Sequence, residues 1–151
     1  MPDPWTSSGS TAAVTILWMV LERPQWGGVG IPVRLPAIYA SRVYEGDLLE
    51  QLVHAASGQL PRDRVASRIV IPDDMEVPTV DVADPPGWRD EVRSREIGGA
   101  WVSSQRSVAL LVPSFMARPW GCNVVINPNH LRFGRVVVVE VVDVLWDPRV
   151  T

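Results

Sequence analysis

The segment AIYASRVYEGDLLEQLVHAASG, residues 37–58, carries a strand pattern that is followed at once by a helix pattern. Residues 37–40 predict a short strand. Ser41 is a residue type that commonly caps the start of a helix, and Gly58 is a natural stop for one. The apolar residues between them recur at helical spacing: Leu48, Leu49, Leu52, Val53 and Ala56. The segment therefore predicts a strand joined to an amphipathic helix.

Further short strand patterns lie on both sides of this segment. Apolar or alternating runs bounded by Pro, Gly or polar residues predict strands at 14–21, 64–71, 107–112 and 122–126. Residues 24–36 and 72–87 are rich in helix and strand breakers and predict loops. A helix is predicted within residues 88–105, broken near Gly98 and Gly99.

The last strand is predicted within residues 135–146. Val137, Val139 and Val141 share one side of it, while the other side includes Glu140, which predicts that the valine side lies in the core. Strands and helices do not alternate regularly along the chain. This order predicts an α+β fold with a small mixed or antiparallel sheet and two or three helices.

Length and composition bound the class of protein. The chain has 151 residues, 46% of them hydrophobic, which is enough for one compact domain, predicted at 12–151 after a flexible leader at 1–11. The net charge of −3 and the scattered basic residues argue against direct nucleic acid binding. The apolar stretch 12–21 is too short to span a membrane. A single cysteine excludes an internal disulfide and suits the reducing cytoplasm, where we expect the protein to act.

Common catalytic motifs are absent from the sequence, namely the Walker loop, G-x-G-x-x-G, H-E-x-x-H and G-x-S-x-G. Glu50 and His54 lie four residues apart and share one stripe of the predicted helix. The spacing fits a carboxylate that faces a reaction site, and it also fits an ordinary solvated glutamate. Cys122 and His130 have no third group to orient them, so we interpret both as packing or surface residues.

An ordered series of short phrases runs from about residue 36 to residue 150. The phrases are DLLEQLVH at 47–54, LPRD at 60–63, IPDD at 71–74, PPGW at 85–88, GGAW at 98–101, RS at 106–107, LVPS at 111–114, NVVINPNH at 123–130 and DPR at 147–149. This series resembles the RES-domain family, named for an Arg, a Glu and a Ser, whose members are toxins of bacterial toxin–antitoxin pairs.

The resemblance implies a fold similar to ADP-ribosyltransferase toxins and an enzyme that destroys NAD. It also implies a helix-turn-helix antitoxin of the Xre type as partner, and no metal. Cleavage of the nicotinamide–ribose bond passes through an oxocarbenium-like centre, so the site needs a nearby carboxylate and a flat aromatic surface. Hydrolysis, phosphorolysis and ADP-ribosyl transfer all remain open.

Three residues take catalytic roles by this resemblance. Glu50 is the carboxylate, Tyr39 packs against nicotinamide or the ribose, and Ser114 hydrogen-bonds NAD or orients Glu50. Structural alternatives are a core tyrosine at a strand end and a serine that stabilises the turn after Pro113.

Four further residues are expected to bind NAD. Ser107 is a second serine that matches a family position, and Asn123 and Asn127 match the family's Asn phrase. Either asparagine could position the dinucleotide or a loop, and Asn127 precedes a proline as turn residues often do. Arg34 is expected to contact the phosphates, since it precedes Tyr39 closely.

The N-terminal third departs from the family pattern. Met19 follows a Leu-Trp pair and Gln25 precedes a Trp, and the family has an arginine at each of these two positions. Arg23 or Arg34 could supply the missing guanidinium from a shifted loop. The alternative is a catalytically impaired RES-like module that only binds a nucleotide or a protein partner.

Overall fold

The computed structural model describes residues 15–22, 37–55, 59–60, 62–79, 91–114, 116–117 and 119–150. The predicted leader at 1–11 and the predicted loop at 24–36 lie outside them. The elements are β1 Thr15–Glu22, β2 Ile38–Ser41, α1 Tyr44–His54, β3 Arg64–Ile71, α2 Glu91–Ser104, β4 Ala109–Pro113, β5 Cys122–Ile126, the 3-10 helix Phe133–Arg135, β6 Val137–Asp143 and the 3-10 helix Pro148–Val150. This architecture confirms the predicted α+β class.

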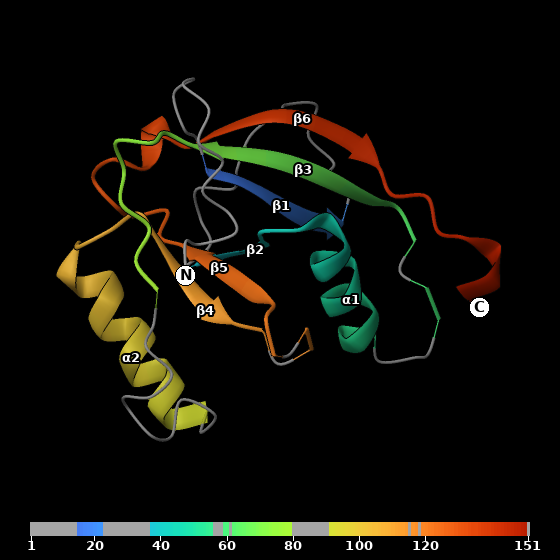
Figure 1. The fold of residues 1–151 in the computed structure, drawn as a ribbon, viewed down its shortest axis with the longest axis horizontal. Coiled ribbons are helices and arrows are strands. Elements are labelled where there is room, and N and C mark those ends of the chain that lie inside the picture. Colours follow the sequence, from blue (N-terminus) through green and yellow to red (C-terminus); the bar gives the residue numbers. More distant parts are fainter. Residues whose placement is uncertain are drawn as a thin grey trace.

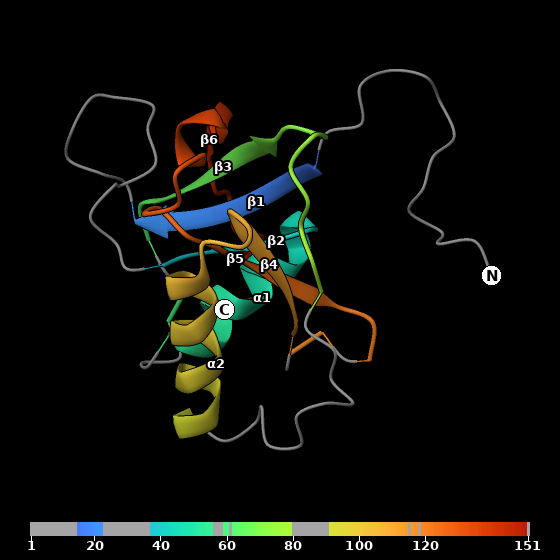
Figure 2. The ribbon, with the colours of Figure 1, turned by 90° about the vertical axis from the view of Figure 1, so that its left-hand side faces the viewer.

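The strands form one sheet in the order β4-β5-β2-β1-β3-β6, and all neighbours are antiparallel. β1 pairs with β3 along all of its residues, but it pairs with β2 only at Trp18 and Ser41. The sheet therefore consists of two strand groups that meet at one point. Figure 1 shows β1, β3 and β6 above β2, β5 and β4, and Figure 2 shows β1 and β3 running across the other group.

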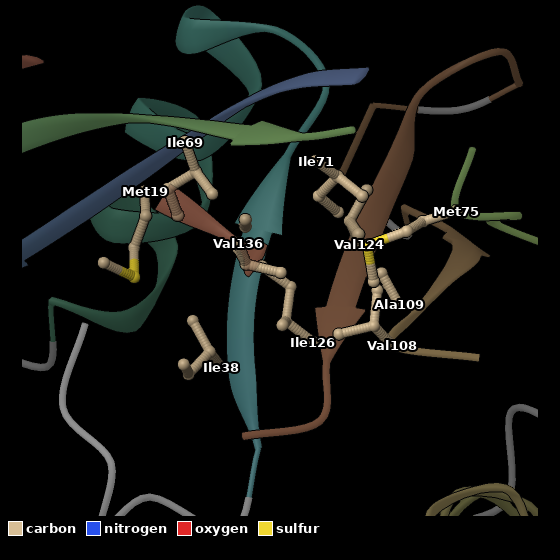
Figure 3. Close-up of a cluster of buried hydrophobic side chains, with 11 residues drawn as sticks. Met19, Ile38, Ile69, Ile71, Met75, Val108, Ala109, Val124, Ile126 and Val136 are labelled. Atoms are coloured by element: carbon tan, nitrogen blue, oxygen red, sulfur yellow. The ribbon is translucent and has the colours of Figure 1, made fainter. Parts of the chain in front are cut away.

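The hydrophobic core lies between these two strand groups. Figure 3 shows Met19, Ile69 and Ile71 of the first group in one cluster with Ile38, Val124 and Ile126 of the second. Because side chains alternate between the faces of a strand, the residues between these point the other way. Tyr39, Ser41, Asn123 and Val125 therefore share the face of β2 and β5 that is turned away from the core. We call this the outer face of β2 and β5.

Helix α1 begins almost directly after β2. Its Tyr44 and Leu48 pack against Ala66 of β3 and Val144 after β6. Burial raises the pKa of the Tyr44 phenol, so that group stays protonated at neutral pH. Since the helix contacts both β1 and β2, it lies where the two strand groups meet.

The start of α1 differs from the prediction. Val43, not Ser41, is the N-cap residue, and no side chain caps the helix. Ser41 instead ends β2, and its side chain is buried at 2% exposure. The paired strand continues through Ser41 because it pairs with both Trp18 and Asn123 there.

Helix α2 is continuous, so the predicted break at Gly98 and Gly99 is wrong. A glycine inside a helix costs only about 1 kcal/mol, which neighbouring residues can offset. The helix ends before Gln105, which adopts the left-handed conformation with φ of 52°. The side-chain amide of Gln105 donates to the Val102 carbonyl and accepts from Leu131 N, and these bonds favour a glutamine at this strained position.

Strand β6 does not bury the side that the valine pattern predicted. Val137, Val139 and Val141 are all exposed. β6 pairs with β3 at the edge of the described sheet, and the pairing register shifts between Arg68 and Ile69. Within β6 only Val138 is half-buried, so neither side of this edge strand is a continuous core face, which alternation alone does not reveal.

Within the described part of the chain, no helix is both long and apolar enough to cross a bilayer.

Candidate functional site

The carboxylate of Glu50 is the centre of the candidate site. Its Oε1 accepts hydrogen bonds from Ser114 Oγ at 3.0 Å and from Asn123 Nδ2 at 2.9 Å. The three side chains come from α1, the residue after β4 and the second residue of β5. Two donors on one oxygen fix the orientation of the carboxylate. The structure thus brings together three of the residues predicted from the sequence.

Ser114 both stabilises its turn and orients Glu50. Its side chain is 3% exposed, and its Oγ accepts from Met116 N at 3.2 Å and from Ala117 N at 3.0 Å. A hydroxyl has a single proton, which Ser114 donates to Glu50. The two roles that the sequence left as alternatives therefore occur together.

Tyr39 lies on the outer face of β2 and β5, as Asn123 does. It pairs with Val125, two residues along β5 from Asn123. Tyr39 is 69% exposed, so it is not a core tyrosine. Its ring is available to a flat ligand group beside the Glu50 carboxylate.

Ser107 and Asn127 lie elsewhere and make structural hydrogen bonds. Ser107 Oγ accepts from Trp101 Nε1 at 2.9 Å and donates to the Ala109 carbonyl at 2.8 Å. Asn127 is fully buried at the end of β5 opposite to Asn123; its Nδ2 donates to the Val102 carbonyl and its Oδ1 accepts from Asn129 N. Since α2 lies beside β4 and away from α1 (Figure 1), we interpret both residues as ties between α2 and the sheet, rather than NAD ligands.

Replacing Asn127 by Ala tests this interpretation. We expect a loss of about 1–3 kcal/mol in the free energy of unfolding, because buried backbone groups lose their partners. Any KM of the folded protein for NAD should stay unchanged. Asn129→Ala, which removes an exposed side chain in the same turn, serves as the control. Chemical denaturation and a KM measurement provide both readouts, and a raised KM without destabilisation contradicts the structural role.

The arginines proposed to contact phosphate, Arg23 and Arg34, lie outside the described residues, as does the His54 side chain. Met19, which the sequence analysis aligned with an arginine of the family, is packed in the core at 3% exposure. The ring of His130 contacts the Gln105 carbonyl through Nε2 and accepts from Arg132 N through Nδ1. Because backbone groups occupy both nitrogens, His130 holds a turn.

No group of three or more His, Cys, Asp or Glu side chains in the described residues could hold a metal ion. The site offers a carboxylate held by Ser114 and Asn123 and an exposed aromatic residue, Tyr39, on the same face of β2 and β5 as Asn123. Such a carboxylate can stabilise positive charge that develops on a sugar ring.

Two glycines near Glu50 were missed by the sequence analysis. A Cβ on Gly46 would lie 2.7 Å from Ser41 Oγ, and a Cβ on Gly121 would lie 2.6 Å from the Ala117 carbonyl oxygen. Both positions therefore depend on the absence of a side chain. The sequence contained one indication of the close approach at Gly46, namely a glycine within the first turn of a helix.

Known proteins resemble this chain in sequence and in fold. The RES domain family matches residues 26–147. The "Prs ADP-ribosylating toxin" of Sphingobium sp. (strain YBL2) is 34% identical over 83% of this chain and 78% of its own length. "Toxin Res" of Yersinia enterocolitica serotype O:8 / biotype 1B (strain NCTC 13174 / 8081) is 30% identical over 75% of this chain and 76% of its own length.

A solved structure has the same fold. A chain in the crystal structure of the M. tuberculosis MbcT-MbcA toxin-antitoxin complex superposes with a TM-score of 0.62 at 15% identity, over 88% of this chain and 85% of that chain. The sequence match spans most of the residues that form the sheet and the Glu50 site. The chain belongs to the RES domain family.

Proposed function

We propose that this chain is an enzymatic toxin that breaks the nicotinamide–ribose bond of NAD, with Glu50 as the carboxylate beside the ribose. The observation that carries the proposal is the pair of hydrogen bonds from Ser114 and Asn123 to Glu50 Oε1. The names of the two relatives support a toxin, and one of those names includes ADP-ribosylation.

In the proposed reaction, the bond between the ribose carbon and the nicotinamide nitrogen breaks, and its electron pair goes to the nitrogen. Nicotinamide then leaves as a neutral molecule, and the sugar carries the positive charge. Glu50 stabilises that charge, while Ser114 and Asn123 hold the carboxylate in place. Water, phosphate or a protein side chain captures the sugar carbon and releases a proton where its nucleophilic atom carries one. Tyr39 provides the flat surface for nicotinamide.

Measurement of NAD with purified protein tests the proposal. We expect release of free nicotinamide, which chromatography separates from NAD. Parallel reactions contain water alone, added phosphate, or purified Prs, the protein in the name of the Sphingobium toxin, as acceptor. Their ADP-ribose products distinguish hydrolysis, phosphorolysis and transfer. Unchanged NAD in all three reactions contradicts the proposal.

One observation favours a second candidate, a RES-like module that binds a nucleotide without turning it over. Met19 fills a family arginine position and is buried in the core, so no guanidinium can act from there. Loss of a bidentate phosphate contact typically removes a few kcal/mol of binding. Calorimetry with NAD separates this candidate, because it predicts binding with no nicotinamide release.

We also propose an antitoxin partner, of the helix-turn-helix Xre type. The similar fold in a toxin-antitoxin complex supports this pairing. Expression of the chain alone should lower cellular NAD and stop growth, and co-expression of the antitoxin should restore both. Growth arrest that persists with a bound antitoxin contradicts a protective role for it.

Ser114→Ala is expected to lower turnover by roughly tenfold, because Glu50 loses the hydroxyl donor that holds its Oε1. Met116 N and Ala117 N also lose their acceptor, so the free energy of unfolding should fall by about 1–3 kcal/mol. Ser103→Ala, on the exposed side of α2, is the control. Kinetics at a temperature where both variants are folded give the comparison, and unchanged kcat in Ser114→Ala excludes an orienting role.

A further inference from the structure

The connection between β4 and β5 is held tightly next to Glu50. Ser114 N donates to the Gly121 carbonyl at 2.9 Å, and Gly121 N donates to the Ala117 carbonyl at 2.7 Å. Ser114 Oγ accepts two further backbone N–H groups from the same connection. A Cβ on Gly121 would lie 2.2 Å from the Ala117 Cβ, which shows how closely the chain folds back there. These bonds tie Ser114, Met116, Ala117 and Gly121 to one another, and we call this hydrogen-bonded set the frame.

The frame presents a large aromatic side chain to solvent. Trp120 is 90% exposed and lies directly before Gly121, where the frame closes. Pro119 precedes it and restricts the backbone on that side. Single exposed apolar residues are common on protein surfaces. Trp120 differs because the next residue, Gly121, is hydrogen-bonded into the frame, which reduces the ordering of the chain that ligand binding requires.

Trp120 and Tyr39 are related to the Glu50 site through β5, on opposite sides of Asn123 along the chain. Asn123 holds Glu50, Trp120 lies three residues before Asn123, and the partner of Tyr39, Val125, lies two residues after it. Three residues of chain span at most about 11 Å. The chain therefore carries one exposed aromatic residue before Asn123, and pairs with another, Tyr39, after it.

We infer that Trp120 is the stacking surface for the adenine ring of NAD. This inference rests on the proposed function, in which Tyr39 takes nicotinamide and Glu50 lies at its ribose. NAD carries its two bases at opposite ends of a pyrophosphate, so a second flat surface is required beyond the carboxylate. Trp120 is the described aromatic side chain that lies in that direction along β5. Stacking of a base on an aromatic side chain is a strong and sequence-independent contact.

The test compares substrates with and without adenine. For Trp120→Ala, we expect KM for NAD to rise by about tenfold, with kcat for NAD and kcat/KM for nicotinamide mononucleotide unchanged. Trp120→Phe should restore most of the NAD affinity. Leu131→Ala is the matched control, because Leu131 is also 90% exposed but follows the far end of β5. Equal losses of kcat/KM for NAD and for nicotinamide mononucleotide, or an unchanged KM for NAD, overturn the inference.

A binding measurement keeps this test separate from turnover. Calorimetry with AMP on wild-type protein and on Trp120→Ala should show about tenfold weaker binding in the variant. That result supports the adenine contact even if the protein releases no nicotinamide. Unchanged AMP binding overturns the inference while leaving the proposed reaction intact. If Trp120→Ala weakens antitoxin binding but leaves the dissociation constant for AMP and the KM for NAD unchanged, Trp120 contacts the protein partner instead, and the inference is overturned.

Discussion

Glu50→Gln lowers NAD turnover by roughly a thousandfold in the mechanism proposed for this chain. Glutamine has nearly the same shape as glutamate and keeps an oxygen that can accept from Ser114 and Asn123. The substitution therefore removes the negative charge and little else. The charge is what stabilises the oxocarbenium-like sugar, so kcat should fall while KM for NAD changes little.

The measurement is nicotinamide release under saturating NAD, with thermal unfolding as the check on folding. Glu45→Gln is the matched control, because Glu45 is an exposed carboxylate in the first turn of the same helix. Turnover by Glu50→Gln at the rate of Glu45→Gln would falsify the role of Glu50. In that case the hydrogen bonds from Ser114 and Asn123 only fasten α1 to the end of β4 and to β5.

Gly46→Ala is expected to lower turnover by roughly a hundredfold, because displacement of a reactive group by about 1 Å has an effect of this size. Gly46 lies one helical turn before Glu50, and its close approach to Ser41 sets the distance between α1 and β2. A Cβ at this position would lie 2.7 Å from Ser41 Oγ and 3.1 Å from Val43 Cγ2. Since Ser41 is buried, α1 must move outward and carry Glu50 away from Asn123.

Gly99→Ala is the control for this prediction. A Cβ on Gly99 has open space around it, so alanine should raise the free energy of unfolding by about 0.5–1 kcal/mol and leave turnover unchanged. The double variant Ser41→Ala with Gly46→Ala removes the nearest clashing atom and should recover much of the turnover. Full activity in Gly46→Ala alone shows that the close approach does not position Glu50.

Local sequence patterns located most of the secondary structure. The predicted strands at 64–71 and 122–126 match β3 and β5 in full. Both patterns are dense in β-branched residues and end at turn formers, Pro72 and Asn127-Pro128. Prediction was wrong where a neighbouring element decides the outcome. Helix α2 continues through Gly98 and Gly99, and the edge strand β6 leaves exposed the valines that the pattern placed in the core.

The sequence alone also distinguished the residues of the Glu50 site from structural residues only in part. Resemblance pointed to Glu50, Ser114 and Asn123, which the structure brings together, and also to Ser107 and Asn127, which bond to the region around α2. Nothing in the spacing of the two serines or of the two asparagines distinguishes them. The face and the end of the strand on which each lies make the difference.

What the sequence by itself determined is the set of strands, the amphipathic helix that carries Glu50 and the family phrases around it. Those features depend on side chains within a few residues of one another, so local spacing is enough to reveal them. Only the tertiary structure decided that Ser114 and Asn123 share Glu50 Oε1, across 64 and 73 residues of chain. Contacts over such separations depend on strand register and on the approach of α1 at Gly46, and both arise only when the two strand groups close around their common core.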